Sequence, residues 1–171
     1  MRNLTEALGA LLTDPGLRFL FSQSPGAAAK RARVAPVDRA AFTALSLDAI
    51  ERQAECLIDK RAQETRSLFP RTAALHGPLY LALFRQYAAT HWPEGLRRQW
   101  LDAAGFLRFL TARGERHEPA EVHRARFHAG TRRLMVKFVR RYPTRLGPRP
   151  ALQLFWRGRR RVRELALHPA F

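Results

Sequence analysis

The spacing of apolar residues changes once along this chain, near residue 130, and this change restricts the possible folds more than any other feature. Between residues 47 and 58, apolar side chains recur at the spacing of one helix face. Beyond residue 130, Leu134, Val136 and Phe138 occupy alternate positions, which is the period of a strand. The sequence therefore predicts a mainly α protein, with a multi-helix N-terminal and central region and a small three-stranded antiparallel β-sheet at the C-terminus.

Capping residues and breakers divide the first part of the chain. Residues 3–6 read Asn-Leu-Thr-Glu, which is typical of a capping box at the start of a helix. Asp14-Pro15 ends this helix and starts a second one, with proline at the first helical position. Ser24-Pro25-Gly26 ends the second helix. Residues 27–37 show little apolar periodicity, so we expect a linker or exposed loop there, followed by a short helix over 38–45.

The central part reads as a series of further helices. Ser46 is placed to cap a long amphipathic helix that runs toward Leu68, and Pro70 ends or kinks it. Breakers at Gly77-Pro78 and in the turn 92–95 separate the helices that follow. These are expected over 79–90, over 96–111, and from Pro119 to about residue 129.

Three strands are expected after residue 130, over 134–139, 151–156 and 161–167, with a loop rich in breakers over 143–150. Three short strands do not fold alone, so they must pack on the helices. The residues expected to make this packing contact are Leu134, Val136, Phe138, Leu152 and Leu154. The expected division is a small N-terminal helical module with a linker (1–46), a helical core domain (47–130) and a C-terminal sheet (131–171).

The charge of the chain is unusual. It has 31 Lys plus Arg against 14 Asp plus Glu, a formal net charge of +17. Residues 112–171 alone hold sixteen basic and four acidic residues. Two interpretations stay open: a solvated surface that reflects the arginine-rich composition of a high-GC genome, or a positive field that attracts an acidic partner. Arginine also favours bidentate contacts to carboxylate or phosphate.

Motifs for catalysis or for metal and cofactor binding are missing from the sequence. No His-Glu-x-x-His, Cys-x-x-Cys, Gly-rich phosphate loop or Gly-x-Ser-x-Gly pattern occurs. The single cysteine, Cys56, is expected to be a small core residue. We expect no catalytic residue, no metal ligand and no cofactor. The sequence shows no signal peptide and no run of about 20 apolar residues, so we expect a cytoplasmic protein without a membrane partner.

A longer pattern crosses the central region. It reads Lys60-Arg61-x-x-Glu64-Thr65-x-x-Leu68-Phe69-Pro70, then Gly77, Phe84-x-x-Tyr87, Trp92-Pro93-Glu94-Gly95, Asp102 and Phe106-x-x-Phe109. This pattern resembles a bacterial domain found beside, or fused to, multinuclear non-haem iron enzymes with a TIM-barrel fold. Those enzymes oxidatively modify ribosomally made peptides. Some relatives of the domain carry the label of DNA-binding domains.

The resemblance implies a non-catalytic accessory protein of ribosomal peptide (RiPP) biosynthesis. Such a protein would form a heterodimer with the iron enzyme and would help present the precursor peptide. The alternative is a basic nucleic-acid-binding protein. The residues proposed to bind the peptide or the partner are Trp92, Leu154, Trp156, Arg157, Arg159, Arg160, Arg161 and Arg163.

Most residues of the family pattern have a structural interpretation. Aromatic residues at helical spacing are more often core than contact, proline and glycine form turns, and Lys60, Arg61 and Glu64 are expected to form a solvated face. The pattern residues expected to be structural are Lys60, Arg61, Thr65, Phe69, Pro70, Gly77, Phe84, Tyr87, Pro93, Gly95, Phe106 and Phe109.

Overall fold

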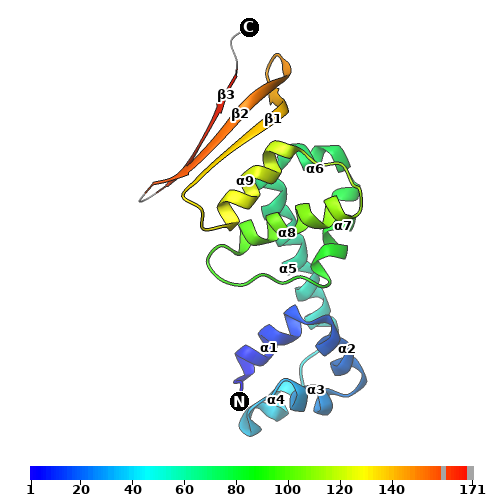
Figure 1. Ribbon diagram of the computed structural model, residues 1–171. Helices are drawn as coiled ribbons and strands as arrows, with labels where there is room; N and C mark the ends of the chain where they lie inside the picture. The colour runs from blue at the N-terminus through cyan, green and yellow to red at the C-terminus, as the bar shows by residue number, and fades with distance from the viewer. Residues whose placement is uncertain (159–160, 169–171) are drawn as a thin grey trace. The chain divides into compact units, whose positions relative to one another are not determined.

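The computed structural model describes residues 1–158 and 161–168 (Figure 1). This part of the chain contains nine α-helices, one 3-10 helix and one antiparallel sheet of three strands at the C-terminal end. The expected fold class is therefore confirmed. The chain divides into two compact units, Met1–Lys60 and Arg61–Phe171, called here the N-terminal and C-terminal units. The division expected at residues 46 and 130 stays a prediction.

The N-terminal unit consists of short helices and the first part of a long one. These are α1 (Leu4–Thr13), α2 (Pro15–Gln23), α3 (Pro25–Arg31), the 3-10 helix Pro36–Asp38, α4 (Arg39–Thr43) and the first part of α5 (Leu47–Leu68). The capping box is present: the Glu6 amide donates to Asn3 Oδ1, and the Asn3 amide donates to Glu6 Oε2. Asp14 caps α2 with Pro15 at its first position, as expected.

The linker expected over residues 27–37 is wrong, because this segment contains most of α3 and the start of the 3-10 helix, and part of it is buried. Ser24 caps α3, with Pro25 at its first position. Ala28, Ala29 and Val34 are buried in the core of the N-terminal unit. Apolar periodicity did not predict this helix, because alanines add few apolar atoms to a periodic pattern, yet their small size allows close packing.

The C-terminal unit begins within α5 and contains four more helices: α6 (Pro70–His76), α7 (Leu79–Ala88), α8 (Arg98–Ala112) and α9 (Pro119–Ala129). Its core is aromatic. The ring centroid of Phe106 on α8 lies 5.3 Å from that of Tyr80 and 5.1 Å from that of Phe84, both on α7, in edge-to-face geometry. Such pairs stabilise a core beyond the burial of their area. Pro70 begins α6, where its missing N–H needs no partner.

The sheet has the order β1 (Leu134–Thr144), β2 (Gly147–Arg157) and β3 (Val162–Leu167). The loop expected over 143–150 is wrong, since both strands continue into a tight turn at Arg145-Leu146 and Thr144 pairs with Gly147. Gly147 has φ +104°, a conformation that favours glycine. Pro143 pairs with Pro148. The two prolines lie opposite each other, so this pair of residues supplies no backbone donor to the ladder.

The sheet packs on α9 (Figure 1). The buried side chains show that the packed face is the one opposite to the expected face. The buried side chains belong to Met135, Val139, Ala151, Gln153 and Phe155. Phe155 stacks on Phe127 of α9 at 5.3 Å between centroids. Of the five residues expected to pack on the helices, Leu154 is half-buried and the others are exposed. Both faces of these strands carry apolar residues, so the alternation along each strand did not indicate which face the helix covers.

Candidate partner-docking site

The strand β3 forms one edge of the sheet. It pairs only with β2 within the sheet, so along its other side the backbone N–H and C=O groups have no strand partner among the described residues. Arg161, directly before β3, and Arg163 within it are exposed. An open edge beside cationic side chains can add an extended peptide strand that carries carboxylates.

The structure brings only some of the proposed binding residues together. Leu154 and Trp156 are half-buried on β2, the central strand, and Trp156 pairs with Arg163 of β3. Because side chains at paired positions share a face, Leu154, Trp156 and Arg163 lie on the same side of the sheet. Arg159 and Arg160 lie outside the described residues. The assignment of these residues to peptide or partner binding stays a prediction.

Arg157 points to the opposite side of the sheet. Its Nη2 donates to the carbonyl oxygens of Phe127 and Gly130, both at 3.1 Å, and its guanidinium lies over the Phe127 ring. Carbonyls at the end of a helix need donors, and a cation there is favourable to the helix dipole. Arg157 therefore caps α9 and holds β2 against it, and its proposed role in binding a peptide stays a prediction.

A polar cluster under the sheet fixes β3 to α9. Glu164 accepts from Arg124 Nε at 2.6 Å and Nη2 at 3.0 Å, and from Gln153 Nε2 at 2.7 Å. Gln153 also donates to the carbonyl of Ala120. Burial by itself would raise the pKa of Glu164, but the hydrogen bonds from Arg124 and Gln153 outweigh it and leave this pKa below its usual value. The edge strand is thus held in place before any partner binds.

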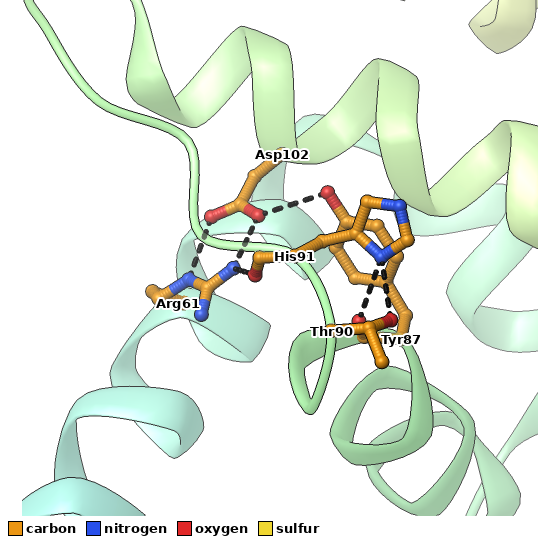
Figure 2. A network of polar contacts seen from close by, with 5 residues as sticks. All are labelled: Arg61, Tyr87, Thr90, His91 and Asp102. Atoms are coloured by element: carbon orange, nitrogen blue, oxygen red, sulfur yellow. Dashed lines mark hydrogen bonds and ion pairs between the residues drawn. The ribbon is translucent and has the colours of Figure 1, made fainter. Parts of the chain in front are cut away.

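A second polar cluster lies within the helices (Figure 2). Arg61 donates from Nε to Asp102 Oδ2 at 2.8 Å and from Nη2 to Oδ1 at 2.6 Å, with both side chains buried. Nη2 also donates to the carbonyl of His91, and the Tyr87 hydroxyl donates to Asp102 Oδ1 at 3.2 Å. Burial, with the nearby Asp102 carboxylate, raises the pKa of Tyr87.

The solvated face expected for Lys60, Arg61 and Glu64 is wrong for Arg61, which is 7% exposed. A charge this buried needs a hydrogen-bonded partner, and Asp102 supplies it from 41 residues away. The family pattern contained both residues, but no local signal in the sequence links them. Only the packing of α8 against α5 brings the carboxylate to the guanidinium.

Trp92 belongs to this helical cluster and not to the sheet. The guanidinium carbon of Arg61 lies 4.3 Å from the Trp92 ring, a cation–π contact, and the indole is half-buried. The following turn, with Pro93 and Gly95, surrounds an open hollow of about 600 Å³. Trp92 thus fixes the loop between α7 and α8, and its free ring area borders the hollow.

The remaining pattern residues lie in the core or at helix ends. Phe69, Phe84 and Phe106 are buried and Phe109 is half-buried. Thr65 is buried, with no hydrogen-bond partner for its hydroxyl. Gly77 ends α6 with φ +52°.

A tertiary cap that the sequence did not predict lies at the start of α6. The buried Glu121 of α9 accepts from the amides of Arg71 and Thr72 and from the Thr72 hydroxyl.

Cys56 is exposed on α5, so the expectation of a core position is wrong. Within residues 1–158 and 161–168, no group of three or more His, Cys, Asp or Glu side chains is arranged to hold a metal ion. No helix in this same part of the chain combines the length and apolarity that crossing a membrane requires.

The fold and these clusters define a mainly α protein with a C-terminal sheet that has an open edge. Residues 44–112 match the family model described as "SCO6045-like, C-terminal domain". The matched segment includes Arg61, Tyr87, Trp92 and Asp102, so the similarity covers the cluster in Figure 2 and not the sheet. No curated protein and no solved structure matches the chain.

Proposed function

We propose that this protein is a non-catalytic partner of a multinuclear iron-dependent enzyme that modifies ribosomally made peptides, and that it helps present the precursor peptide. The observation that carries the proposal is the open edge of β3 beside the exposed Arg161 and Arg163. The resemblance of the pattern between residues 60 and 110 supplies the class of enzyme.

The peptide would join the sheet as a fourth strand along β3. Hydrogen bonds between main chains give affinity in this mode, and contacts to alternate side chains give selectivity. Acidic side chains of the peptide would meet Arg161 and Arg163 in charge-assisted hydrogen bonds. The enzyme would dock elsewhere on the protein, so that peptide and enzyme are held by the same molecule.

Two experiments test this proposal. The protein is co-expressed with a multinuclear iron-dependent enzyme of this class and purified through a tag on one partner, and we expect both to elute together. Separate elution at low salt would contradict the partnership. Hydrogen exchange then follows the amides of 162–167 with the precursor peptide added, and we expect exchange there to slow.

The charge contribution has a matched control. The double variant Arg161→Gln/Arg163→Gln should weaken peptide binding, because it removes both cations beside the edge. The double variant Arg52→Gln/Arg108→Gln changes the net charge equally at exposed positions of α5 and α8 and should bind as the unmodified protein does. Equal weakening by both variants would mean that net charge alone attracts the peptide.

The net charge of +17 favours a second candidate function, nucleic-acid binding. Fluorescence anisotropy with two duplexes of unrelated sequence, measured over a range of salt, tests it. A preference for one duplex that persists at physiological salt would support this function. Affinity that falls steeply with salt, with no preference, would indicate nonspecific attraction.

A further inference from the structure

The side of the sheet that faces away from α9 is an exposed apolar surface, called here the outer sheet face. The strand register arranges it as three rows across β1, β2 and β3. The rows are Leu134–Trp156–Arg163, Val136–Leu154–Leu165 and Phe138–Leu152–Leu167. Every position except Arg163 is apolar.

These apolar side chains are open to solvent. Phe138 is 59% exposed, Val136 52% and Leu167 50%. Apolar patches of this kind on a folded protein mark interaction surfaces. A sheet that is apolar on both faces is normally the middle of three layers. Here α9 supplies one layer, and within the described residues of the C-terminal unit nothing covers the other face.

Exposed arginines border the outer sheet face. They belong to a segment, residues 131–171, whose sequence contains twelve basic residues and one acidic residue. That one carboxylate, Glu164, lies on the opposite face and is paired with Arg124. On the outer side, Arg140 follows Phe138 and Arg163 completes the first row, both exposed. A complementary partner therefore needs an apolar centre with acidic residues on both flanks.

A second copy of this chain does not meet that requirement. Two outer sheet faces pressed together would bring two arginine borders into contact with no carboxylate between them. The face measures roughly 10 Å across three strands and about 13 Å along three rows.

The dimensions of the face fit a helix. The width of roughly 10 Å across three strands equals the diameter of an α-helix with its side chains.

We propose that the outer sheet face docks an amphipathic helix of a partner protein, whose apolar stripe is flanked by Asp and Glu. This surface differs from the β3 edge, because it recognises side chains and not an open backbone. The proposal holds for any partner that carries such a helix.

The probe is a stapled peptide of roughly 14 residues, with Leu and Ile on one face and Glu on both flanks. A second peptide has Lys in place of Glu, and a third has the acidic composition with a scrambled order. Binding to the full chain is measured by titration calorimetry, and NMR shift changes map the contact. We expect the acidic amphipathic peptide alone to bind, with shifts centred on Val136, Leu154 and Leu165.

The variant Leu154→Lys separates apolar contact from charge. It places a cation at the centre of the face, and we expect the acidic peptide to bind at least about tenfold more weakly. The matched control Leu79→Lys changes a residue that is 67% exposed on α7, and binding should stay within about twofold. Should Leu154→Lys unfold, Leu165→Ser on the edge strand takes its place.

Several results would overturn the proposal. They are stronger binding by Leu154→Lys, equal binding by the Lys peptide, or no binding at millimolar acidic peptide. A dimer in sedimentation that Leu154→Lys dissociates would assign the face to a second copy. Preference for phosphatidylserine vesicles over the peptide would assign it to a membrane. None of these results alters the exchange measurement at the β3 edge, so the two proposals fail separately.

Discussion

Arg61 and Asp102 form a buried bidentate ion pair between α5 and α8, with nitrogen–oxygen distances of 2.8 and 2.6 Å. Trp92 covers the guanidinium and Tyr87 donates to the carboxylate. Four segments of the C-terminal unit therefore meet at one pair of charges. All three tryptophans lie in this unit, at positions 92, 100 and 156, so tryptophan fluorescence follows its unfolding.

Removing one charge of this pair should be strongly destabilising. Asp102→Asn keeps the size of the side chain but leaves the Arg61 guanidinium buried without its counter-charge. We expect the free energy of unfolding to fall by about 3–5 kcal/mol. Urea unfolding followed by tryptophan fluorescence measures it. Glu94→Gln removes a carboxylate from an exposed turn and should change stability by less than about 0.5 kcal/mol. Equal effects would mean that the ion pair is not a structural requirement.

Gly105 is a close-approach position on α8. A Cβ built there would lie 2.3 Å from the Tyr87 hydroxyl oxygen and 3.0 Å from the ring carbon that carries it. Gly105→Ala should therefore displace Tyr87 from Asp102 and cost about 1–3 kcal/mol, as overpacking does. Thermal unfolding followed by tryptophan fluorescence measures this.

The control for this substitution is Gly9→Ala on α1, followed by circular dichroism because the three tryptophans lie in the C-terminal unit. A Cβ at Gly9 meets nothing within 4 Å, and alanine is the better helix former, so stability should stay equal or rise by up to about 1 kcal/mol. Adding Tyr87→Phe to Gly105→Ala removes the nearest atom and should recover part of the loss. A Gly105→Ala protein as stable as the unmodified one would contradict the close approach.

Glu164 should make stability depend on pH in the acidic range. Its folded pKa lies below its usual value, because hydrogen bonds from Arg124 and Gln153 outweigh the effect of burial. The stabilisation is present above the unfolded pKa, close to 4.5, and is lost as the pH falls through the folded pKa.

The urea midpoint of the unmodified protein should therefore fall below about pH 4.5, and in Glu164→Gln part of this fall should be missing. Glu55→Gln, at an exposed position of α5, should keep the full fall. The same pH profile for all three proteins would mean that Glu164 does not contribute.

Glu121 caps α6 from a distance of about 50 residues in sequence. Replacing it by Ala leaves the amides of Arg71 and Thr72 and the Thr72 hydroxyl without their acceptor. We expect a loss of about 1–3 kcal/mol, measured by urea unfolding with tryptophan fluorescence. Thr72→Ser keeps the hydroxyl and should cost less than Thr72→Val, which removes it. Slow exchange of the Arg71 and Thr72 amides in the Glu121→Ala protein would contradict the cap.

Much of the fold could be predicted because its signals are local. The capping box at Asn3, the proline starts of α2 and α9, and the alternation at Leu134–Phe138 depend on neighbours a few residues away. The predictions of a linker over 27–37 and of a loop over 143–150 were wrong, because the structure of these segments depends on distant contacts and not on local signals. Alanine packing in α3 and the pairing of Pro143 with Pro148 depend on what lies across the core or across the hairpin.

For the candidate site, too, local features could be predicted from the sequence and long-range contacts could not. The sequence by itself determined that the last segment forms three strands, with apolar residues on both faces and arginine in excess. Tertiary structure decided that Phe155 faces α9 and Phe138 faces solvent, that Arg157 caps a helix, and that Arg61 meets Asp102. The physical reason is that periodicity and capping act within a few residues, whereas burial and charge pairing depend on contacts between distant segments.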